Sequence, residues 1–446
     1  MQKIREAGVT GAGGAGFPTH AKLDYARVDR RVECLIANGA ECEPLLQGDK
    51  ELMITRARDL VNGVLMAVQI TGAEKPVIAV KARYAEVVEA LRKAIPGTGI
   101  QLVTLDDFYP AGDEQVLVYE IAGRVVPEGG IPLGVGVVVQ NVQTLINIDA
   151  ATRGIPVTDR YLTIAGDVPQ PVTVKVPIGT SVRALLEEYA GGVSGRLIID
   201  GGPMMGRIVD ENQVVTKTTG GLILLPGDHP LVEKRALPAE KLIRRSRAAC
   251  VQCSQCTDLC PRRLLGHRIQ PHQVMRALGY NLARPELLLQ TLICSECGVC
   301  DLVCPMGLTP RAVNIMFKRQ LAREGVKYTP GPVKYAAGPD GYLPHPMREY
   351  RKVPVKRILS ALGLSSYYRK APLAGEEFRP EKVGIPLRQH IGTPAQPVVQ
   401  PGDRVKKGDL IAEIPAEALG IRMHASITGV VEEVGERITI VRSGEE

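Results

Sequence analysis

Two copies of one cysteine pattern constrain this chain more than any other feature. The pattern C-x2-C-x2-C-x3-C-P occupies residues 250–261 and recurs at residues 294–305. Thiolates at this spacing reach three corners of a cubane iron–sulfur cluster, while the fourth cysteine, held beyond the turn by proline, normally ligates a second cluster. The duplicated pattern therefore predicts two [4Fe–4S] clusters in a module that needs iron to fold.

The predicted ligand sets are crossed, because each run lends its fourth cysteine to the other cluster. A structural zinc site usually has two ligand pairs with a longer spacer, and disulfides would not explain a duplicated spacing, but both stay open as alternatives. The sets are Cys250, Cys253, Cys256 and Cys304 for the first cluster, and Cys294, Cys297, Cys300 and Cys260 for the second.

The length and composition indicate a multidomain protein of the cell interior. A chain of 446 residues is too long for one core, and 45% hydrophobic with 23% charged residues is typical of globular domains. Eight of the ten cysteines lie in the two runs, which indicates a reducing compartment and a cytoplasmic location. The N-terminus has no apolar signal core, and polar residues interrupt the most apolar stretch, residues 131–148, so we expect neither export nor a transmembrane segment.

The charge balance does not favour nucleic acid as a partner. The net charge of +7 is modest for this length, and its basic clusters are typical of a solvated surface. Trp is absent and Phe numbers four, so few side chains could stack on bases. We therefore expect no nucleic-acid partner.

Changes in sequence pattern divide the chain into five parts. Apolar runs at 32–37 and 76–80 alternate with helical patterns at 59–70 and 85–94, which predicts an α/β sheet. The C-terminal part has two similar turn-and-strand halves, as in lipoyl-type barrel sandwiches, but residues 423–426 stand where the modified lysine would be. The predicted parts are an α/β domain (1–155), an α+β unit (156–228), the cluster segment (229–329), a basic Pro- and Gly-containing surface connector (330–383) and the barrel-sandwich hybrid (384–446).

A glycine-rich loop at residues 11–18 matches G-x-G-x-x-G but lacks the context of a dinucleotide fold. A Rossmann loop follows a strand, whereas residues 1–10 are polar and helical, and the first good strand comes later. Glycines let backbone amides approach a phosphate closely, and Pro18 can start a helix whose N-terminus favours an anion. The loop thus predicts a phosphate-bearing cofactor, with a tight structural turn as the alternative.

Four segments together resemble a known protein. Residues 13–22, 37–44, 109–114 and 140–145 are similar in sequence and order to the FMN- and NADH-binding segments of the complex I flavoprotein. The α+β unit resembles a β-grasp-like SLBB domain, and the cluster segment resembles a two-cluster ferredoxin. The whole chain resembles the RnfC/PduS-like iron–sulfur flavoproteins. Its C-terminal barrel sandwich is placed as in the cobalamin reductases of that family, whereas RnfC-type members carry it at the N-terminus.

The resemblance implies the residues of a flavin site. Gly13, Gly14 and Gly16 would line the flavin, Lys22 its ring edge, and Phe17, Glu41 and Glu43 the nicotinamide nucleotide. Two departures favour FMN over NADH, since Ala12 and Ala40 stand where the complex I pattern has arginine and aspartate. The rest of the implied FMN shell is Asn38, Glu41, Tyr109, Glu114, Asn141 and Thr144.

The resemblance also implies an activity. We expect an NADH-dependent oxidoreductase that passes electrons from FMN through two clusters, because a flavin accepts two electrons and donates them singly. The implied acceptor is cobalamin, free or on an enzyme such as an adenosyltransferase, in the cytoplasm or inside a bacterial microcompartment and near its shell proteins. The alternatives are an RnfC-like electron-transport protein that exchanges electrons with ferredoxin, and a non-catalytic electron-transfer protein.

Overall fold

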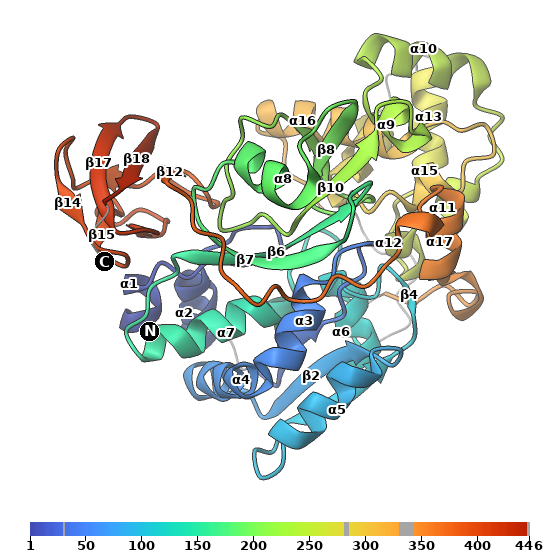
Figure 1. Ribbon diagram of the computed structural model, residues 1–446. Helices are drawn as coiled ribbons and strands as arrows, with labels where there is room; N and C mark the ends of the chain where they lie inside the picture. The colour runs from blue at the N-terminus through green and yellow to red at the C-terminus, as the bar shows by residue number, and fades with distance from the viewer. Residues whose placement is uncertain (30–31, 281–284, 330–341, 444–446) are drawn as a thin grey trace.

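The N-terminal domain is a parallel sheet with helices on both faces. The structure, a computed structural model, describes residues 1–29, 32–280, 285–329 and 342–443 (Figure 1). The strand order is β3-β2-β1-β5, and all three pairings are parallel. The elements are α1 (Gln2–Glu6), α2 (Thr19–Asp29), β1 (Cys34–Gly39), α3 (Gly48–Thr55), α4 (Ala57–Thr71), β2 (Lys75–Lys81), α5 (Ala85–Ala94), β3 (Gln101–Leu105), β4 (Phe108–Tyr109), α6 (Glu114–Ala122), η1 (Pro132–Val135), β5 (Val137–Asn141) and α7 (Val142–Thr152).

Alternate residues of the central strand enter two different cores. Leu35 packs with α4 and α7, while Ile36 packs on the opposite face with α6. A parallel sheet covered on both faces reads as a continuous apolar run, which is why the runs at 32–37 and 76–80 predicted its strands. The two predicted helices are confirmed as α4 and α5.

The central unit is a mixed sheet with one helix, and it lies between the N-terminal domain and the cysteine segment (Figure 1). Its strand order is β7-β6-β10-β8-β9, in which β6 and β10 are parallel and the other pairs antiparallel. Helix α8 covers one face in a separate core. The elements are β6 (Asp159–Gly166), β7 (Val172–Pro177), α8 (Val182–Ala190), β8 (Arg196–Asp200), β9 (Arg207–Val209) and β10 (Gly221–Pro226).

The cysteine segment consists of short helices around a small core that α10, α13 and α16 share. Its cysteines lie at helix ends and in turns, because the repeated pattern leaves little room for longer elements. Across the described residues, no helix is long and apolar enough to cross a bilayer. The elements are α9 (Pro230–Arg235), α10 (Ala239–Ala249), α11 (Gln255–Asp258), α12 (Pro261–Leu264), α13 (Pro271–Tyr280), α14 (Pro285–Leu289), η2 (Gln290–Ile293), α15 (Val299–Leu302) and α16 (Pro310–Arg323).

The C-terminal part forms the predicted barrel sandwich, which lies beside α1 (Figure 1). One sheet has the order β12-β18-β17-β14 and the other β13-β15-β16. Its core is continuous with that of the N-terminal domain. The strands are β12 (Lys382–Pro386), β13 (Gln396–Pro397), β14 (Arg404–Val405), β15 (Leu410–Glu413), β16 (Met423–His424), β17 (Gly429–Val434) and β18 (Arg437–Arg442).

The predicted surface connector, residues 330–383, is largely exposed where it is described, but several of its apolar side chains are buried. Residues 330–341 lie outside the described residues, but strand β11 (Val353–Pro354) pairs with β4, and α17 (Val355–Ala361) packs Ile358 into a core. Apolar residues spaced between the basic ones give this stretch an inward face, so the chain here packs on the units that it joins while its basic side chains stay at the surface. The short 3-10 turns are η3 (Glu349–Arg351) and η4 (Ser365–Tyr367).

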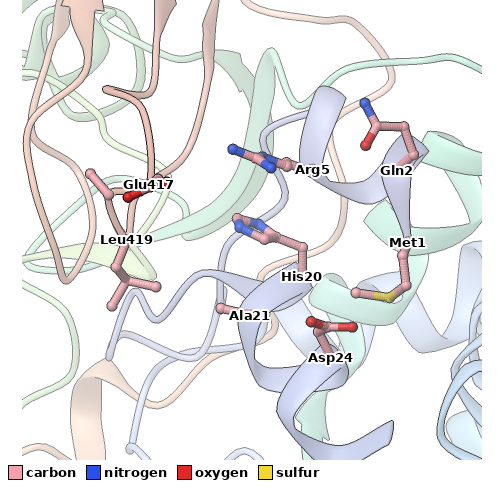
Figure 2. A pocket seen from close by; sticks show the side chains of 9 residues that line it. Met1, Gln2, Arg5, His20, Ala21, Asp24, Glu417 and Leu419 are labelled. Carbon is pink, nitrogen blue, oxygen red and sulfur yellow. The ribbon is translucent and has the colours of Figure 1, made fainter. Parts of the chain in front are cut away.

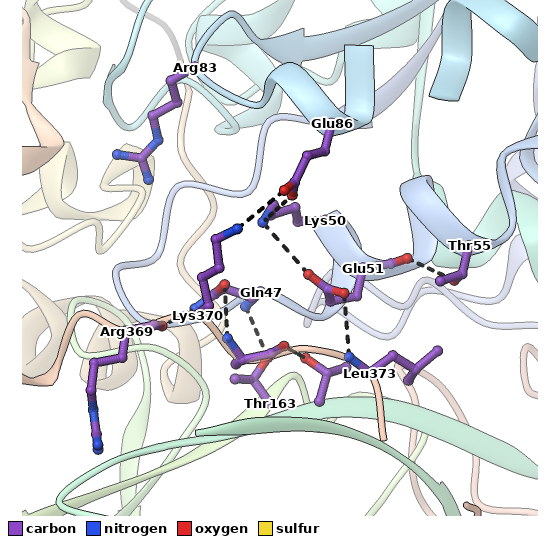
Figure 3. Close-up of polar contacts among 12 residues, drawn as sticks. Gln47, Lys50, Glu51, Thr55, Arg83, Glu86, Thr163, Arg369, Lys370 and Leu373 are labelled. Atoms are coloured by element: carbon purple, nitrogen blue, oxygen red, sulfur yellow. Dashed lines mark hydrogen bonds and ion pairs between the residues drawn. The ribbon is translucent and has the colours of Figure 1, made fainter. Parts of the chain in front are cut away.

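The chain then runs between the N-terminal domain and the central sheet. Gln47, just before α3, donates from its side chain to the Arg369 carbonyl over 2.6 Å, and its backbone amide donates to Thr163 of β6 over 2.9 Å. Lys370 pairs with Glu86 of α5 (Figure 3). Residues 369–373 therefore join the two units along one edge.

Candidate functional site

The glycine loop lies between α1 and α2 and closes on itself. The Gly11 amide donates to the Phe17 carbonyl over 2.9 Å. Gly14 has a φ of +100°, and a Cβ built there would meet nothing within 4 Å. Backbone of this kind favours glycine, and the space beside it is open. The loop follows a helix rather than a strand, as the sequence predicted, which is not the Rossmann arrangement.

The loop fits an anionic group because some of its amides are free. The Ala12 amide donates to Thr144 Oγ1 over 2.9 Å. Within the part of the chain that the structure describes, the amides of residues 13–16 have no hydrogen-bond acceptor. Consecutive unpaired amides form a concavity that binds anions. The donor set therefore suits the phosphate of a nucleotide such as FMN.

Lys22 of α2 and Glu114 of α6 face each other beside the sheet. Lys22 Nζ donates to Glu114 Oε1 over 3.0 Å and to the Val139 carbonyl over 2.7 Å. Both side chains are partly exposed. The lysine ammonium is therefore held against the middle of β5.

Asn141 connects the start of α7 to a buried carboxylate. Its Oδ1 accepts from the Gln143 amide over 2.9 Å, which caps the helix, and its Nδ2 donates to Asp49 over 2.6 Å. A Cβ at Gly13 would lie 3.4 Å from the Asn141 Cβ. The structure thus brings Gly13, Asn141 and Thr144 together as predicted site residues, and it adds Asp49.

Asn38 lies near the end of β1, and Glu41 follows that strand at the same edge of the sheet. Asn38 Nδ2 donates to the Gly112 carbonyl over 2.9 Å, and Glu41 accepts from the Glu43 amide over 2.9 Å. Burial, with the Asp49 carboxylate as the next cause, raises the pKa of Glu41. A nearby like charge and burial both disfavour the ionised carboxylate, so Glu41 holds its proton more firmly than an exposed glutamate.

Among the other predicted site residues, the side chains of two bind other units, and that of a third lies at the surface. Glu43 accepts from the Met204 and Met205 amides of the central unit, over 2.8 and 2.7 Å. The Tyr109 hydroxyl donates to the Cys297 carbonyl over 2.7 Å. Phe17 is partly exposed at the end of the loop. Glu43 and Tyr109 thus join the N-terminal domain to the units that follow it.

The cysteines form two groups of four. Each group combines three thiols of one run with the fourth thiol of the other, the arrangement that crossed ligation requires. All ten cysteines are free thiols in the structure. Four converging thiols fit an iron–sulfur cluster. Cys250, Cys253, Cys256 and Cys304 line one cavity, and Cys260, Cys294, Cys297 and Cys300 line another.

The second cysteine group lies next to the predicted flavin segments. Arg262, two residues after Cys260, forms a two-fold ion pair with Asp113, at 2.7 and 2.9 Å. Asp113 also caps α6 and precedes Glu114. Together with the Tyr109 contact, this ion pair connects the second cysteine group directly to the predicted flavin segments.

Sequence reasoning missed three polar residues near the loop. Arg160 of the central unit donates to the Ala12 carbonyl of the loop, Lys217 donates to the Gly8 carbonyl just before it, and Asp49 accepts from Asn141. One signal was present for Arg160. Strand alternation puts it on the same face as the apolar Leu162 and Ile164, and an inward arginine on such a face is unusual.

An open cavity of about 440 Å³ lies away from these residues. It separates α1 and α2 from the loop around Glu417 and is lined by Arg5, His20 and Asp24 (Figure 2). Burial and the nearby Arg5 lower the pKa of His20. None of the predicted site residues lines this cavity.

Three stretches match known domain families. Residues 4–150 match the Nuo51 FMN-binding domain, residues 249–309 a 4Fe-4S dicluster domain, and residues 370–446 the RnfC barrel sandwich hybrid domain. The chain resembles an NAD+-reducing [NiFe]-hydrogenase structure in fold, with a TM-score of 0.51 at 19% identity over 77% of this chain and 67% of that one.

Sequence relatives extend this likeness over the full chain. A component of the proton-translocating ferredoxin:NAD(+) oxidoreductase complex of Clostridium ljungdahlii is 37% identical over 58% of this chain and 55% of its own. The cobalamin reductase PduS of Citrobacter freundii is 44% identical over 99% of this chain and 96% of its own. That of Salmonella typhimurium is 46% identical with the same coverage. The predicted family is confirmed, and the chain belongs to the family of the cobalamin reductase PduS.

Proposed function

We propose that this chain is an NADH-dependent flavin and iron–sulfur oxidoreductase that reduces cobalamin. The observation that carries the proposal is the 46% identity to a protein named cobalamin reductase over 99% of this chain. A likeness of this extent covers every module, including those that the shorter RnfC-type matches leave out. Free cobalamin or cobalamin on an adenosyltransferase would be the acceptor, in the cytoplasm or inside a microcompartment and near its shell proteins.

FMN would bind on the glycine loop. Bound FMN supplies the exchange between a transferred hydride and single electrons. The free amides of residues 13–16 and the Thr144 hydroxyl are the donors for its phosphate, and Lys22 places a cation that favours a reduced, anionic ring. Glu41 belongs to the implied FMN shell, and burial raises the pKa of its carboxyl, so it would face the flavin as a group that holds its proton more firmly than an exposed one.

Two [4Fe–4S] clusters would occupy the two four-thiol cavities. The set with Cys260 lies beside Tyr109 and Arg262, which connect it to the flavin segments. The set with Cys250 includes Cys253, whose side chain is exposed. The set with Cys260 is therefore suited to receive electrons from the flavin, and the set with Cys250 is suited to pass them to an acceptor at the surface. The unit at 156–228, which resembles an SLBB domain, holds the loop from the other side.

NADH has fewer contacts in its favour than FMN. Ala12 and Ala40 replace residues of the complex I pattern, and Glu43 is already bound by two backbone amides of the central unit. A nicotinamide nucleotide would therefore depend on Phe17 and Glu41, which keep partly exposed surface.

Exchange of electrons with ferredoxin is the second candidate. It is favoured by the 37% identity, over 58% of this chain, to a component of a ferredoxin:NAD(+) oxidoreductase complex. A non-catalytic electron-transfer protein is the third, and the occupied Glu43 carboxylate favours it.

Anaerobic stopped-flow mixing separates the three. NADH should bleach the flavin first, and cobalamin should be reduced in a later phase that a Cys297→Ser variant slows or loses. Reduction of ferredoxin but not of cobalamin would favour the second candidate. A flavin that stays oxidised with NADH but is reduced by ferredoxin would exclude the NADH-oxidising role.

A further inference from the structure

Two buried cations of the central unit lie against the glycine loop. Arg160, 4% exposed at the start of β6, donates from Nη2 to the Ala12 carbonyl over 2.8 Å and from Nε to the Thr219 carbonyl over 2.6 Å. Lys217, 3% exposed, donates from Nζ to the Gly8 carbonyl over 2.8 Å and to the Arg422 carbonyl over 3.1 Å. The N-terminal loop is thus held by residues from a different unit.

Neither cation has a close anionic partner among the described residues. No carboxylate oxygen there lies within 4.0 Å of either one, and Arg160 Nη1 is buried without a hydrogen-bond partner. Asp49, Asp200 and Glu41 act on Arg160 only from further away, and burial lowers the pKa of Arg160 to about 10 and that of Lys217 to about 7. Burying a charge in this way is costly. An anion bound on the loop would offset part of that cost.

The hydrogen bonds also select one orientation of the loop. The carbonyls of Gly8 and Ala12 point toward the cations, and the carbonyl of Gly16 accepts from the Ile391 amide over 2.9 Å. The amides of residues 13–16 are left free. Gly8 has a φ of +63°, and a Cβ there would clash with the backbone carbonyl oxygen of Arg422 and lie 2.8 Å from Lys217 Nζ, so the close approach at this end depends on a glycine.

We propose that Arg160 and Lys217 are positioning residues of the flavin site. They hold the Ala12 carbonyl in the loop and the Gly8 carbonyl just before it, so that the free amides of residues 13–16 can bind the FMN phosphate. The inference rests on the proposed binding of FMN to this loop. It means that the affinity for FMN depends on the central unit as well as on residues 1–155.

The test uses the full-length protein and measures FMN affinity by quenching of flavin fluorescence. Arg160→Met and Lys217→Met should each weaken FMN binding by about tenfold, the effect of one charge-assisted hydrogen bond. Arg160→Lys should recover part of the affinity, because lysine can still donate to a carbonyl. Arg348→Met is the matched control, since Arg348 is 5% exposed and pairs with Glu120 away from the loop.

The outcomes separate the inference from the proposed function. If the unaltered protein binds no FMN, the proposed function fails and the inference fails with it. If it binds FMN and Arg160→Met binds equally well, the inference alone is overturned. An equal loss of affinity in Arg348→Met, or no recovery in Arg160→Lys, would indicate general destabilisation and would also overturn it. The thermal unfolding midpoint of each variant is measured without FMN. The midpoints of Arg160→Met and Arg348→Met should be similar, which would show that the loss of FMN affinity does not come from a loss of stability.

Discussion

The ion pair between Arg262 and Asp113 should carry much of the docking of the cysteine segment onto the N-terminal domain. Arg262 binds both oxygens of Asp113, and the two side chains are only 11% and 15% exposed. We predict that Arg262→Met destabilises the cysteine segment. The variant keeps a long apolar side chain but removes both charge-assisted bonds.

The expected loss follows from burial and from what Asp113 retains. Removing one partner of a buried pair costs about 3–5 kcal/mol, whereas an exposed pair contributes at most about 1 kcal/mol. Asp113 still accepts from the amides of Gln115 and Val116 after the substitution. These bonds compensate part of its charge, so we expect a loss of about 2–3 kcal/mol in the free energy of unfolding.

A double-mutant cycle measures this interaction. Arg262→Met, Asp113→Ala and the double variant are unfolded in urea, and the loss of visible cluster absorbance reports the cysteine segment. The coupling energy should be about 1–2 kcal/mol, since the alanine variant also loses its helix cap. Arg263→Met, the neighbouring arginine with no ion pair to a described residue, is the control and should cost under about 0.5 kcal/mol. A coupling energy below about 0.5 kcal/mol would refute the reasoning, because the pair would then behave as a surface contact.

Three further predictions concern the cofactors and the buried lysine. Reconstituted protein should hold about eight iron and eight sulfide per chain, and Cys260→Ser should alter the electron paramagnetic resonance signal of the cluster held by the second run; stoichiometric zinc without visible absorption would contradict this. Gly14→Trp should abolish FMN binding in a fluorescence titration because the ring would fill the open space beside the loop, and undiminished binding would place the flavin elsewhere. Burial lowers the pKa of Lys217 from 10.5 in the unfolded chain to about 7 in the folded protein. Between pH 7 and pH 10.5 the unfolded chain therefore binds one proton more than the folded protein does. Stability relative to Lys217→Met should therefore rise with pH across that window, by at most about 1.4 kcal/mol per pH unit, and a flat difference in urea midpoints would show that burial does not lower the pKa of Lys217.

The features that could be predicted from sequence are those that local pattern determines. The strand at 76–80 follows from an uninterrupted apolar run, and the cysteine spacing follows from the geometry of a cluster. The packing of the connector could not be predicted in this way. Strand β11, just before the helix that buries Ile358, pairs with β4, which is far away in the chain.

The same limit applies to the site. The residues of the loop and Asn141 lie together, as the resemblance implied, since each belongs to a segment of one domain. Tyr109 instead binds the Cys297 carbonyl, a contact between residues 188 positions apart. Arg160 reaches the loop from another unit, so no motif could include it. Contacts between units depend on how the units dock, and a local pattern does not contain that information.

The position of the barrel sandwich beside α1 makes the order of the modules interchangeable. The loop around Glu417 faces Arg5 and His20 across one cavity (Figure 2), so the barrel sandwich lies against the first helices of the chain. A barrel sandwich joined ahead of α1 by a short linker could pack at the same position as one joined after the connector. Circular permutation would then move the module along the gene without moving it in the molecule.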